Sequence, residues 1–380
     1  MTISLLHPFT PQAVGVIEQN VARYHSQPHV KALQQLMHEH SDVRVTVDYF
    51  TPKFRVYNYS HGNIEYRFFP VDFSWHGDHK KWRKQYSKSC LKVYKNNLPD
   101  VTIINMSAHS SRFSHQLAKT IVKHGKNYIA MLGGQHYTDT PENRTYYKQA
   151  HHILVHTQLQ KETMELMPMF QGCDIRVFSL GVEANLFKPA VKKEEGGTIK
   201  LLQVCRFSRL KQIELSIEAV SFLKLQGIDV SLEIIGFKSD LIYLKELKVL
   251  VKKLSLESQV KFMDAVAQND LIEVYQNADI LLMPSNHESF GMVMVEAMAC
   301  GLPVVALKNS GGPEELIAHG ISGLLCEEST FSRDILNLIT SKTLLKSMSV
   351  NSRNRAAEKY SLAKTYEILL KSVRDALKLS

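Results

Sequence analysis

The sequence predicts an α/β protein made of two doubly wound domains of parallel β-sheet that face each other across a cleft. From residue 199 onward, short apolar segments typical of strands alternate with longer segments typical of helices. The chain has 380 residues, which is more than one simple core holds and fits two domains. A polar stretch at residues 189–197 ends in two glycines and is the best candidate for the linker between them.

The first half of the chain shows a less regular form of this alternation. A helix is expected around residues 18–24, after the first strand. Parallel strands need right-handed crossover connections, so further helices are expected between the later strands. The segments expected to form strands are residues 3–7, 44–50, 101–105, 128–132 and 153–155.

The second half alternates more cleanly. The expected strands cover residues 199–204, 230–235, 259–263, 280–283 and 304–307. The expected helices cover residues 213–225, 240–254 and 269–277, then a run that follows Ser289, and another that opens at Gly311. A last helix is expected at about residues 362–377. We therefore predict a first domain at 1–190, a second at 191–355, and a C-terminal helical segment at 356–380.

The composition is that of a folded protein of the cytoplasm. Hydrophobic residues make up 44% and charged residues 22% of the chain. Glu296 interrupts the longest apolar stretch, so no transmembrane segment is expected, and residues 2–6 are too short for a secretory signal. The five cysteines are scattered, odd in number and without a Cys-x-x-Cys pair, which favours reduced thiols over disulfides or zinc.

The positive charge of the chain is concentrated in one segment. The net charge is +9, and residues 76–95 contain seven Lys or Arg against one Asp. Residues 79–95 also place apolar side chains at helical spacing, which leaves two interpretations. One is an amphipathic helix on an anionic membrane that delivers a lipid-linked acceptor; the other is a crossover helix that packs its apolar stripe inward. No nucleic-acid partner is expected, because no recognised binding module accompanies the charge.

Two carboxylates separated by seven residues are the most informative feature of the chain. Glu288 lies in the loop after the expected strand 280–283, and Glu296 lies in the helix that follows. In a doubly wound sheet, ligands bind at the loops after the carboxyl ends of the strands. Glu288 is therefore expected at the mouth of a site, and Glu296 about two turns deeper. The alternative is an ordinary amphipathic helix with one solvated and one capping Glu.

Two cations stand at an earlier strand-to-helix junction. Arg206 and Lys211 follow the expected strand 199–204. Arg binds phosphate oxygens in a bidentate manner, Lys adds a compact positive charge, and helix N-termini favour anions. These residues are candidates to bind a phosphate, although two surface cations near a helix start would look the same. Gly311 and Gly312 open a later helix, and their backbone N–H groups are expected to meet a ligand.

These motifs together resemble those of the retaining glycosyltransferases of family 4, which have the GT-B fold of two Rossmann-like domains. The resemblance covers residues 199–326 and a segment before the linker, residues 179–189. It implies that Glu288 contacts the hydroxyls of a donor sugar and that Glu296 contacts the nucleotide ribose. It also implies a diphosphate held by Arg206 and Lys211, with Cys205 and Gln212 where the family has Gly, and a last helix that returns to the first domain.

The resemblance adds further candidates of lower specificity. Ser289, Phe290 and Gly291 lie within the Glu motif and are candidates for donor binding. In the first half, Gly15 stands where the family has a Gly-Gly-x-Glu loop, with one Gly missing. The family often has a His near the reacting centre, and the expected position holds Gly133. His136 and His109 follow neighbouring strands and are the alternatives.

The predicted function is transfer of a sugar from a nucleoside-diphosphate sugar, most simply a UDP-sugar, to an acceptor hydroxyl with retention at the anomeric carbon. The resemblance implies no cofactor and no metal, and no His-Glu-x-x-His zinc pattern occurs in the chain. Two other classes of function remain open. One is a different GT-B enzyme, such as a nucleotide-sugar epimerase or a phosphorylase; the other is a non-catalytic partner subunit that binds a nucleotide sugar.

Overall fold

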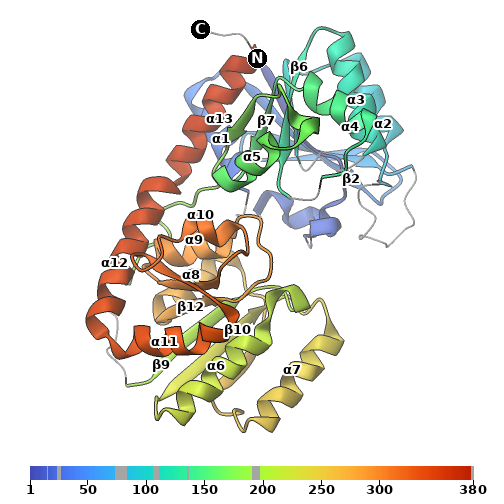
Figure 1. The fold of residues 1–380 in the computed structure, drawn as a ribbon. Coiled ribbons are helices and arrows are strands. Elements are labelled where there is room, and N and C mark those ends of the chain that lie inside the picture. Colours follow the sequence, from blue (N-terminus) through green and yellow to red (C-terminus); the bar gives the residue numbers. More distant parts are fainter. Residues whose placement is uncertain are drawn as a thin grey trace. The chain divides into compact units, whose positions relative to one another are not determined.

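The computed structural model divides the chain into two compact units. It describes residues 1–14, 16–23, 27–72, 84–105, 111–134, 137–190 and 197–377. The first unit combines Met1–Leu180 with the chain from Leu362 onward, and the second unit is Gly181–Ser361. Each unit has its own sheet with helices around it (Figure 1). This arrangement confirms the predicted α/β class with two doubly wound parts.

The first unit is built on an eight-stranded sheet of order β3-β4-β2-β1-β5-β6-β7-β8. Its neighbouring strands are parallel except for β3 and β4, which form an antiparallel hairpin at one edge. Its strands are β1 (Thr2–His7), β2 (Arg44–Thr51), β3 (Tyr57–His61), β4 (Ile64–Pro70), β5 (Val101–Asn105), β6 (Asn127–Leu132), β7 (His152–Val155) and β8 (Ile175–Val177).

Alternate residues of these strands enter two separate hydrophobic cores. Leu5 and Ile103 point into a core shared with the helices at Pro28–Glu39 and Leu362–Leu377. Leu6 and Ile104 point into a core shared with the helices at Lys88–Asn96, Arg112–Lys123 and Pro141–Gln149. A parallel sheet covered on both faces explains why its strands are continuous apolar runs. The helices of the unit are η1 (Pro11–Val14), η2 (Glu18–Arg23), α1 (Pro28–Glu39), α2 (Lys88–Asn96), α3 (Arg112–Lys123), α4 (Pro141–Gln149), α5 (Gln158–Glu165), η4 (Pro168–Phe170) and α13 (Leu362–Leu377).

The structure changes one expectation for the first half and bears on a second. The helix expected at residues 18–24 is a 3-10 segment, and the α-helix of this crossover begins only at Pro28, a residue suited to the first helical position. In the basic segment, residues 79–83 lie outside the described part, and α2 begins at Lys88. There α2 buries Cys90, Leu91 and Tyr94 and exposes its lysines, as a crossover helix does.

The second unit is built on a six-stranded, fully parallel sheet of order β11-β10-β9-β12-β13-β14. Its strands are β9 (Ile199–Val204), β10 (Val230–Gly236), β11 (Val260–Asp264), β12 (Ile280–Met283), β13 (Val304–Leu307) and β14 (Gly323–Cys326). Its helices are η5 (Arg209–Lys211), α6 (Ile213–Leu225), α7 (Leu241–Lys253), α8 (Gln268–Asn277), α9 (Met292–Ala299), α10 (Gly312–Leu316), η6 (Glu328–Thr330), α11 (Phe331–Thr340) and α12 (Lys342–Lys359).

The strand order of the second sheet reverses next to its first strand. From β9 the chain proceeds through β10 to β11 on one side, and then returns to place β12, β13 and β14 on the other. The loops after β9 and β12 therefore diverge at the carboxyl edge of the sheet, and this switch point is where open α/β sheets bind ligands. Among the described residues, no helix has the length and apolar character needed to cross a bilayer.

Candidate functional site

The residues predicted to bind the donor follow the two strands at the switch point. Arg206 and Lys211 lie between β9 and α6, and Glu288 lies between β12 and α9. The structure joins two of them directly, because the ammonium of Lys211 forms an ion pair with a carboxylate oxygen of Glu288. The two side chains retain only 13% and 16% of their exposure, so solvent screens this pair less than a surface pair.

The turn that presents Lys211 is held by backbone and side-chain contacts. The Lys211 N–H donates to the carbonyl of Ser208 at 2.9 Å, and Gln203 Nε2 donates to the carbonyl of Lys211 at 3.1 Å. The next residue, Gln212, has a left-handed backbone with φ 40° and ψ 52° just before α6. The family element has Gly at this position, and Gly adopts the left-handed conformation without strain. For Gln212 the same conformation costs free energy, because its Cβ crowds the backbone.

The start of the same junction is shaped by a close backbone approach. Cys205 lies beside Gly236 at the end of β10, where a Cβ on Gly236 would stand 1.7 Å from the Cys205 carbonyl oxygen. Burial raises the pKa of the Cys205 thiol to about 12, and it therefore stays protonated at neutral pH. Arg206, in contrast, is exposed and forms no ion pair with a described residue. Its guanidinium is therefore accessible to a ligand.

The Glu288 loop is fixed by two backbone hydrogen bonds to the loop after β13. The Glu288 N–H donates to the carbonyl of Ser310, and the Gly312 N–H donates to the carbonyl of Glu288, both at 2.7 Å. The Gly311 N–H donates to the Glu314 carboxylate at 2.8 Å. The expectation that the N–H groups of Gly311 and Gly312 meet a ligand is therefore wrong, since both have partners within the unit. The Gly312 N–H clamps the Glu288 loop, whereas the Gly311 N–H caps α10 through Glu314.

Close packing explains why glycine occupies two of these positions. A Cβ on Gly312 would lie 2.3 Å from the carbonyl oxygen of Phe290, and Gly291 has φ 95° at the start of α9. The Phe290 side chain is 2% exposed and packs edge-on against Tyr360, with ring centroids 6.1 Å apart. Any contact of Phe290 with a donor would have to come from its backbone. Ser289 is partly exposed next to Glu288.

Glu296 is a buried residue of α9 with both carboxylate oxygens engaged. It is 3% exposed, accepts a hydrogen bond from the Tyr275 hydroxyl at 2.8 Å, and accepts another from the Gln268 amide. Burial, together with this carboxylate, raises the pKa of Tyr275 far above its ordinary value, so the phenol remains a donor. Sequence reasoning missed Gln268 and Tyr275, which reach Glu296 from α8, a helix without any recognisable motif.

The first-unit candidates Gly15, His109 and His136 lie outside the described residues, and their predicted roles stay predictions. The Glu of the Gly15 loop, Glu18, is described and is 5% exposed. It accepts a hydrogen bond from Thr51 at 2.6 Å and another from Tyr57, and pairs with Lys53 at 3.0 Å. Burial opposes ionisation of Glu18, but these contacts outweigh it and lower its pKa. Glu18 therefore anchors the start of η2 to β2 and β3.

A polar cluster that sequence reasoning did not single out lies near the carboxyl ends of the first sheet. His7 ends β1, His156 follows β7 and His29 is in the first turn of α1, and each is at least nine-tenths buried. Asn105 donates a hydrogen bond to His7 at 3.1 Å, and the rings of His7 and Tyr49 stack with centroids 4.1 Å apart. In the sequence, the polar residues His7, Asn105 and His156 at the ends of apolar strands were the signal that could have identified this cluster.

Burial keeps these histidines neutral. It lowers the pKa of His29 to about 3, with a contribution from the nearby His156, and lowers the pKa of His156 itself to about 4. It also lowers the pKa of His7 well below the ordinary value, and His29 adds to that effect. The cluster is therefore an uncharged polar part of the core near neutral pH.

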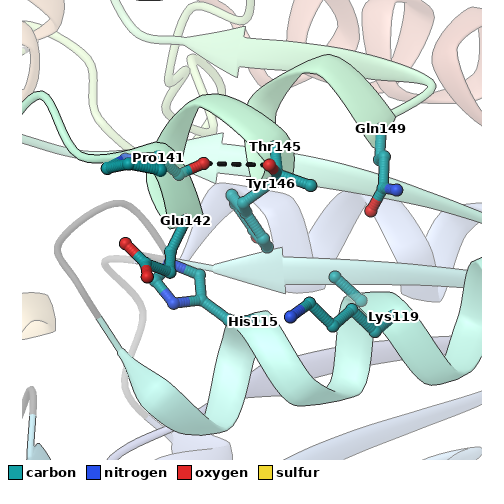
Figure 2. Close-up of a pocket in the computed structure, with 8 residues that line it drawn as sticks. His115, Lys119, Pro141, Glu142, Thr145, Tyr146 and Gln149 are labelled. Carbon is teal, nitrogen blue, oxygen red and sulfur yellow. Dashed lines mark hydrogen bonds between the residues drawn. The ribbon is translucent and has the colours of Figure 1, made fainter.

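A small cavity lies elsewhere in the first unit, between α3 and α4 (Figure 2). Its volume is about 190 Å³. Residues on both helices line it: His115, Ala118, Lys119, Pro141, Glu142, Thr145, Tyr146 and Gln149. Within its wall Thr145 donates a hydrogen bond to the carbonyl of Pro141 at 2.9 Å, one turn earlier on α4. None of the predicted site residues lines this cavity, and we assign it no function.

Comparisons with known proteins find a family model that matches most of the second unit. Residues 186–355 match the family model described as "Glycosyl transferases group 1". An N-acetyl-α-D-glucosaminyl L-malate synthase of Bacillus anthracis is 28% identical over 209 residues, which cover 53% of this chain and 52% of that protein. The chain spans about half the length of the curated relatives it matches.

Solved structures match the whole chain. A glycosyltransferase from Rickettsia africae ESF-5 has a TM-score of 0.76 at 17% identity and covers 100% of this chain and 99% of its own. An Anabaena protein, HepE, solved with UDP and glucose, has a TM-score of 0.72 at 18% identity, with 98% of this chain and 99% of its own covered. At such identities the likeness establishes the fold. The chain thus has the GT-B fold, and its residues 186–355, which carry Lys211 and Glu288, match the family model of the glycosyl transferases group 1.

Proposed function

We propose that the protein transfers a sugar from a nucleoside-diphosphate sugar to an acceptor hydroxyl and retains the configuration at the anomeric carbon. The observation that carries this proposal is the Lys211–Glu288 ion pair at the switch point of the second sheet. It sets a cation beside a carboxylate in a partly buried place where ligands of doubly wound sheets bind. The Lys211 cation suits a diphosphate, and the Glu288 carboxylate suits sugar hydroxyls.

The cations of the β9–α6 junction suit a departing diphosphate. As the bond between the anomeric carbon and the phosphate oxygen breaks, negative charge builds on the diphosphate. Lys211 is held by its backbone contacts, and Arg206 is exposed on the same short segment. Positioned cations of this kind stabilise developing charge without reorganising, which is usually the largest single contribution to catalysis.

Glu288 suits the orientation of the sugar. Its carboxylate accepts hydrogen bonds only, so it can pair with sugar hydroxyls or with the Lys211 ammonium. A diphosphate that takes over Lys211 as its counter-ion would release Glu288 for those hydroxyls. The backbone clamp to Ser310 and Gly312 keeps the loop in place during such an exchange.

Glu296 would act from deeper in the unit. Both of its oxygens accept hydrogen bonds, from Gln268 and Tyr275. A ribose hydroxyl would replace or share the bond from Gln268, which is partly exposed at the start of α8. Tyr275 is buried and would continue to hold the other oxygen.

The proposed chemistry needs no nucleophile from the chain. The acceptor oxygen attacks the anomeric carbon from the face that the diphosphate leaves, and its proton passes to the leaving phosphate oxygen. The bond from carbon to phosphate oxygen breaks while the bond from carbon to acceptor oxygen forms. We expect no metal, because Arg206 and Lys211 supply the positive charge that the diphosphate needs.

The comparisons support a UDP-sugar as the donor class. HepE was solved with UDP and glucose, and the Bacillus anthracis relative is named for an N-acetylglucosaminyl product of L-malate.

Thermal-shift binding of UDP-, GDP-, ADP- and dTDP-sugars tests the donor site. We expect one nucleotide class to stabilise the wild type, and Arg206→Ala and Lys211→Ala to weaken that binding about 30-fold each, as loss of a hydrogen bond between charged groups does. Lys224→Ala is the matched control, since Lys224 lies at the far end of α6 and donates to the carbonyl of Ser255. Binding of the donor by Lys211→Ala with wild-type affinity would overturn the site.

Turnover is the second readout. A transferase releases the nucleotide only when an acceptor hydroxyl is present, and Glu288→Gln should remove that release while the fold is retained. An epimerase or phosphorylase would convert the donor without such an acceptor. A partner subunit would bind the donor and release no nucleotide with any acceptor.

A further inference from the structure

Helix α7 of the second unit has an unusual outer side. Its inner side is an ordinary core face, with Tyr243, Leu244, Leu247 and Val251 buried against the sheet and α6. In Figure 1 the helix lies next to α6 at one end of the second unit. Asp240 caps its N-terminus by accepting from the N–H groups of Ile242 and Tyr243.

The outer side combines large apolar residues with lysines. Leu241, Ile242 and Val249 are 63%, 70% and 68% exposed, and Ile242 and Val249 are two turns apart on one line of the helix. Residues of this size are seldom so exposed in a group, because an apolar patch on a monomer is costly to solvate. The α7 face is formed by Leu241, Ile242, Lys245, Lys248, Val249 and Lys252.

The cations of the α7 face are uncompensated. Lys245, Lys248 and Lys252 are exposed and form no ion pair with a described residue. The one acidic residue of the helix, Glu246, is bound through both carboxylate oxygens by Arg209 of η5, at 2.8 and 2.7 Å. The Asp240 carboxylate is engaged in the cap. The face therefore presents positive charge beside an exposed apolar line.

We infer that the α7 face binds the surface of an anionic lipid bilayer. Apolar side chains of a helix that lies in the interface enter the boundary between headgroups and acyl chains, while lysines extend along it and keep their ammonium groups at the phosphates. The spacing of the α7 face fits both demands: Ile242 and Val249 share one line of the helix, and Lys245, Lys248 and Lys252 follow along one side of it. The attraction increases with the number of lysines near an anionic surface.

The chemistry of the face is less suited to two other partners. A second copy of the chain with the same face opposed would bring two sets of lysines together, and like charges without partners repel. A nucleic acid would satisfy the lysines and leave Leu241, Ile242 and Val249 without apolar contacts. The inference is independent of the proposed enzymatic function, because it uses none of the donor-site residues.

Co-sedimentation of the full chain with vesicles tests the inference. We expect binding to phosphatidylcholine vesicles that contain about one third phosphatidylglycerol and none to pure phosphatidylcholine vesicles, with binding that weakens as salt is raised. The double variant Ile242→Ser/Val249→Ser should bind at least about tenfold more weakly. The triple variant Lys245→Glu/Lys248→Glu/Lys252→Glu should lose binding.

Helix α12 supplies matched controls. Val350→Ser removes an apolar residue that is 56% exposed there, and Lys342→Glu/Lys346→Glu/Lys359→Glu makes the same change in charge on exposed lysines of that helix. Both controls should bind as the wild type does. A wild type that does not bind anionic vesicles, or α12 variants that lose as much binding as the α7 variants, would refute the assignment. Loss confined to Lys88→Glu/Lys92→Glu/Lys95→Glu would place the contact on α2 instead.

Discussion

Lys211 and Gln212 are neighbours that show how a family element can keep its charge and change its backbone. The cation at position 211 reaches Glu288, although position 212 lacks the Gly that a left-handed turn favours. The turn still forms, because the backbone of Lys211 is hydrogen-bonded to Ser208 and Gln203 and α6 begins directly after Gln212. The sequence alone indicated the charges and could not show that Gln212 takes the glycine conformation.

Gln212→Gly should stabilise the protein by about 1 kcal/mol, because glycine adopts the left-handed conformation without the steric cost that Gln bears. The side chain contributes little in return, as its bond to Glu328 is 3.4 Å long. Urea unfolding gives the change in free energy. Gln212→Ala is the control: it removes the same side chain and keeps the strained backbone, so it should not stabilise. Equal stability of the two variants would contradict the argument.

The buried histidines of the first unit make stability dependent on pH. The pKa values of His29 and His156 are lowered to about 3 and about 4, whereas an unfolded His titrates near 6.5. Each histidine is neutral in the folded state and takes up a proton on unfolding once the pH is below about 6.5. Stability is therefore full above that pH and decreases below it, by about 1.4 kcal/mol per pH unit for each of the two.

Urea midpoints at pH 7.5, 6.5 and 5.5 measure this slope in a range above the titration of ordinary carboxylates. His29→Gln and His156→Gln should each flatten it between pH 6.5 and 5.5, because the variant has one fewer group to protonate. His38→Gln, at an exposed position on the same α1 helix, should leave the slope unchanged. A wild type whose midpoint does not move over this range would show that the cluster is protonated or open.

At the level of elements, the clamp between the β12–α9 and β13–α10 loops is the feature on which the site depends. Gly312→Ala should destabilise the protein by about 2 kcal/mol, since its Cβ would meet the Phe290 carbonyl oxygen at 2.3 Å and that backbone is fixed in the core. Donor binding should weaken as well, because the Gly312 N–H donates to the carbonyl of Glu288. Thermal unfolding and donor titration measure the two effects. Gly197→Ala is the control, as nothing lies within 4 Å of its added Cβ.

Local pattern predicted the elements of the second unit better than those of the first. The strands of the second unit are uninterrupted apolar runs with helices of regular period between them, so the sequence indicated β9, β10 and β12 closely. In the first unit the β3–β4 hairpin was missed, since its polar-rich strand pairs only at the sheet edge. The start of α1 was misplaced because Glu18 is bound by Thr51 and Tyr57 from distant strands, and local propensity carries no such information.

The candidate site was likewise predictable from the sequence only in part. The motif at Glu288 and the cations at Arg206 and Lys211 could be read from the chain, because they follow strands whose carboxyl ends are recognisable. Contacts between loops could not be predicted: the pairing of Glu288 with Ser310 and that of Glu296 with Gln268 join segments with no shared pattern. The same limit applied to the histidine cluster, which three separate segments bring together.

On the scale of the whole molecule, α13 is the element that makes the first unit discontinuous. Leu369 and Val373 of this helix are each 1% exposed and share a core with Leu33 and Leu36 of α1. Thr365 also donates a hydrogen bond to the carbonyl of Ser179 at 2.9 Å. The first unit therefore contains residues from both sides of the second in sequence.

Leu369→Ala should destabilise the first unit by about 3 kcal/mol through loss of buried area and the cavity it leaves. Hydrogen exchange measured by mass spectrometry along a urea titration follows peptides of the two units separately. Peptides of β1 and α1 should lose protection at lower urea, while peptides of β9 and α6 keep theirs. Lys364→Ala, which loses only an exposed pair with Glu367, is the control. Loss of protection in both sets of peptides together would mean that the units unfold as one.

The discontinuity of the first unit has a consequence for synthesis on the ribosome. All of Gly181–Ser361 leaves the exit tunnel before the residues of α13 do, so the second unit has its complete set of strands and helices first. The first unit, although translated earlier, must wait with the α1 side of its core uncovered until Leu369 and Val373 emerge. For this chain the order of translation and the order in which the units can complete their cores are opposite, and the nascent first unit is the part most in need of a chaperone.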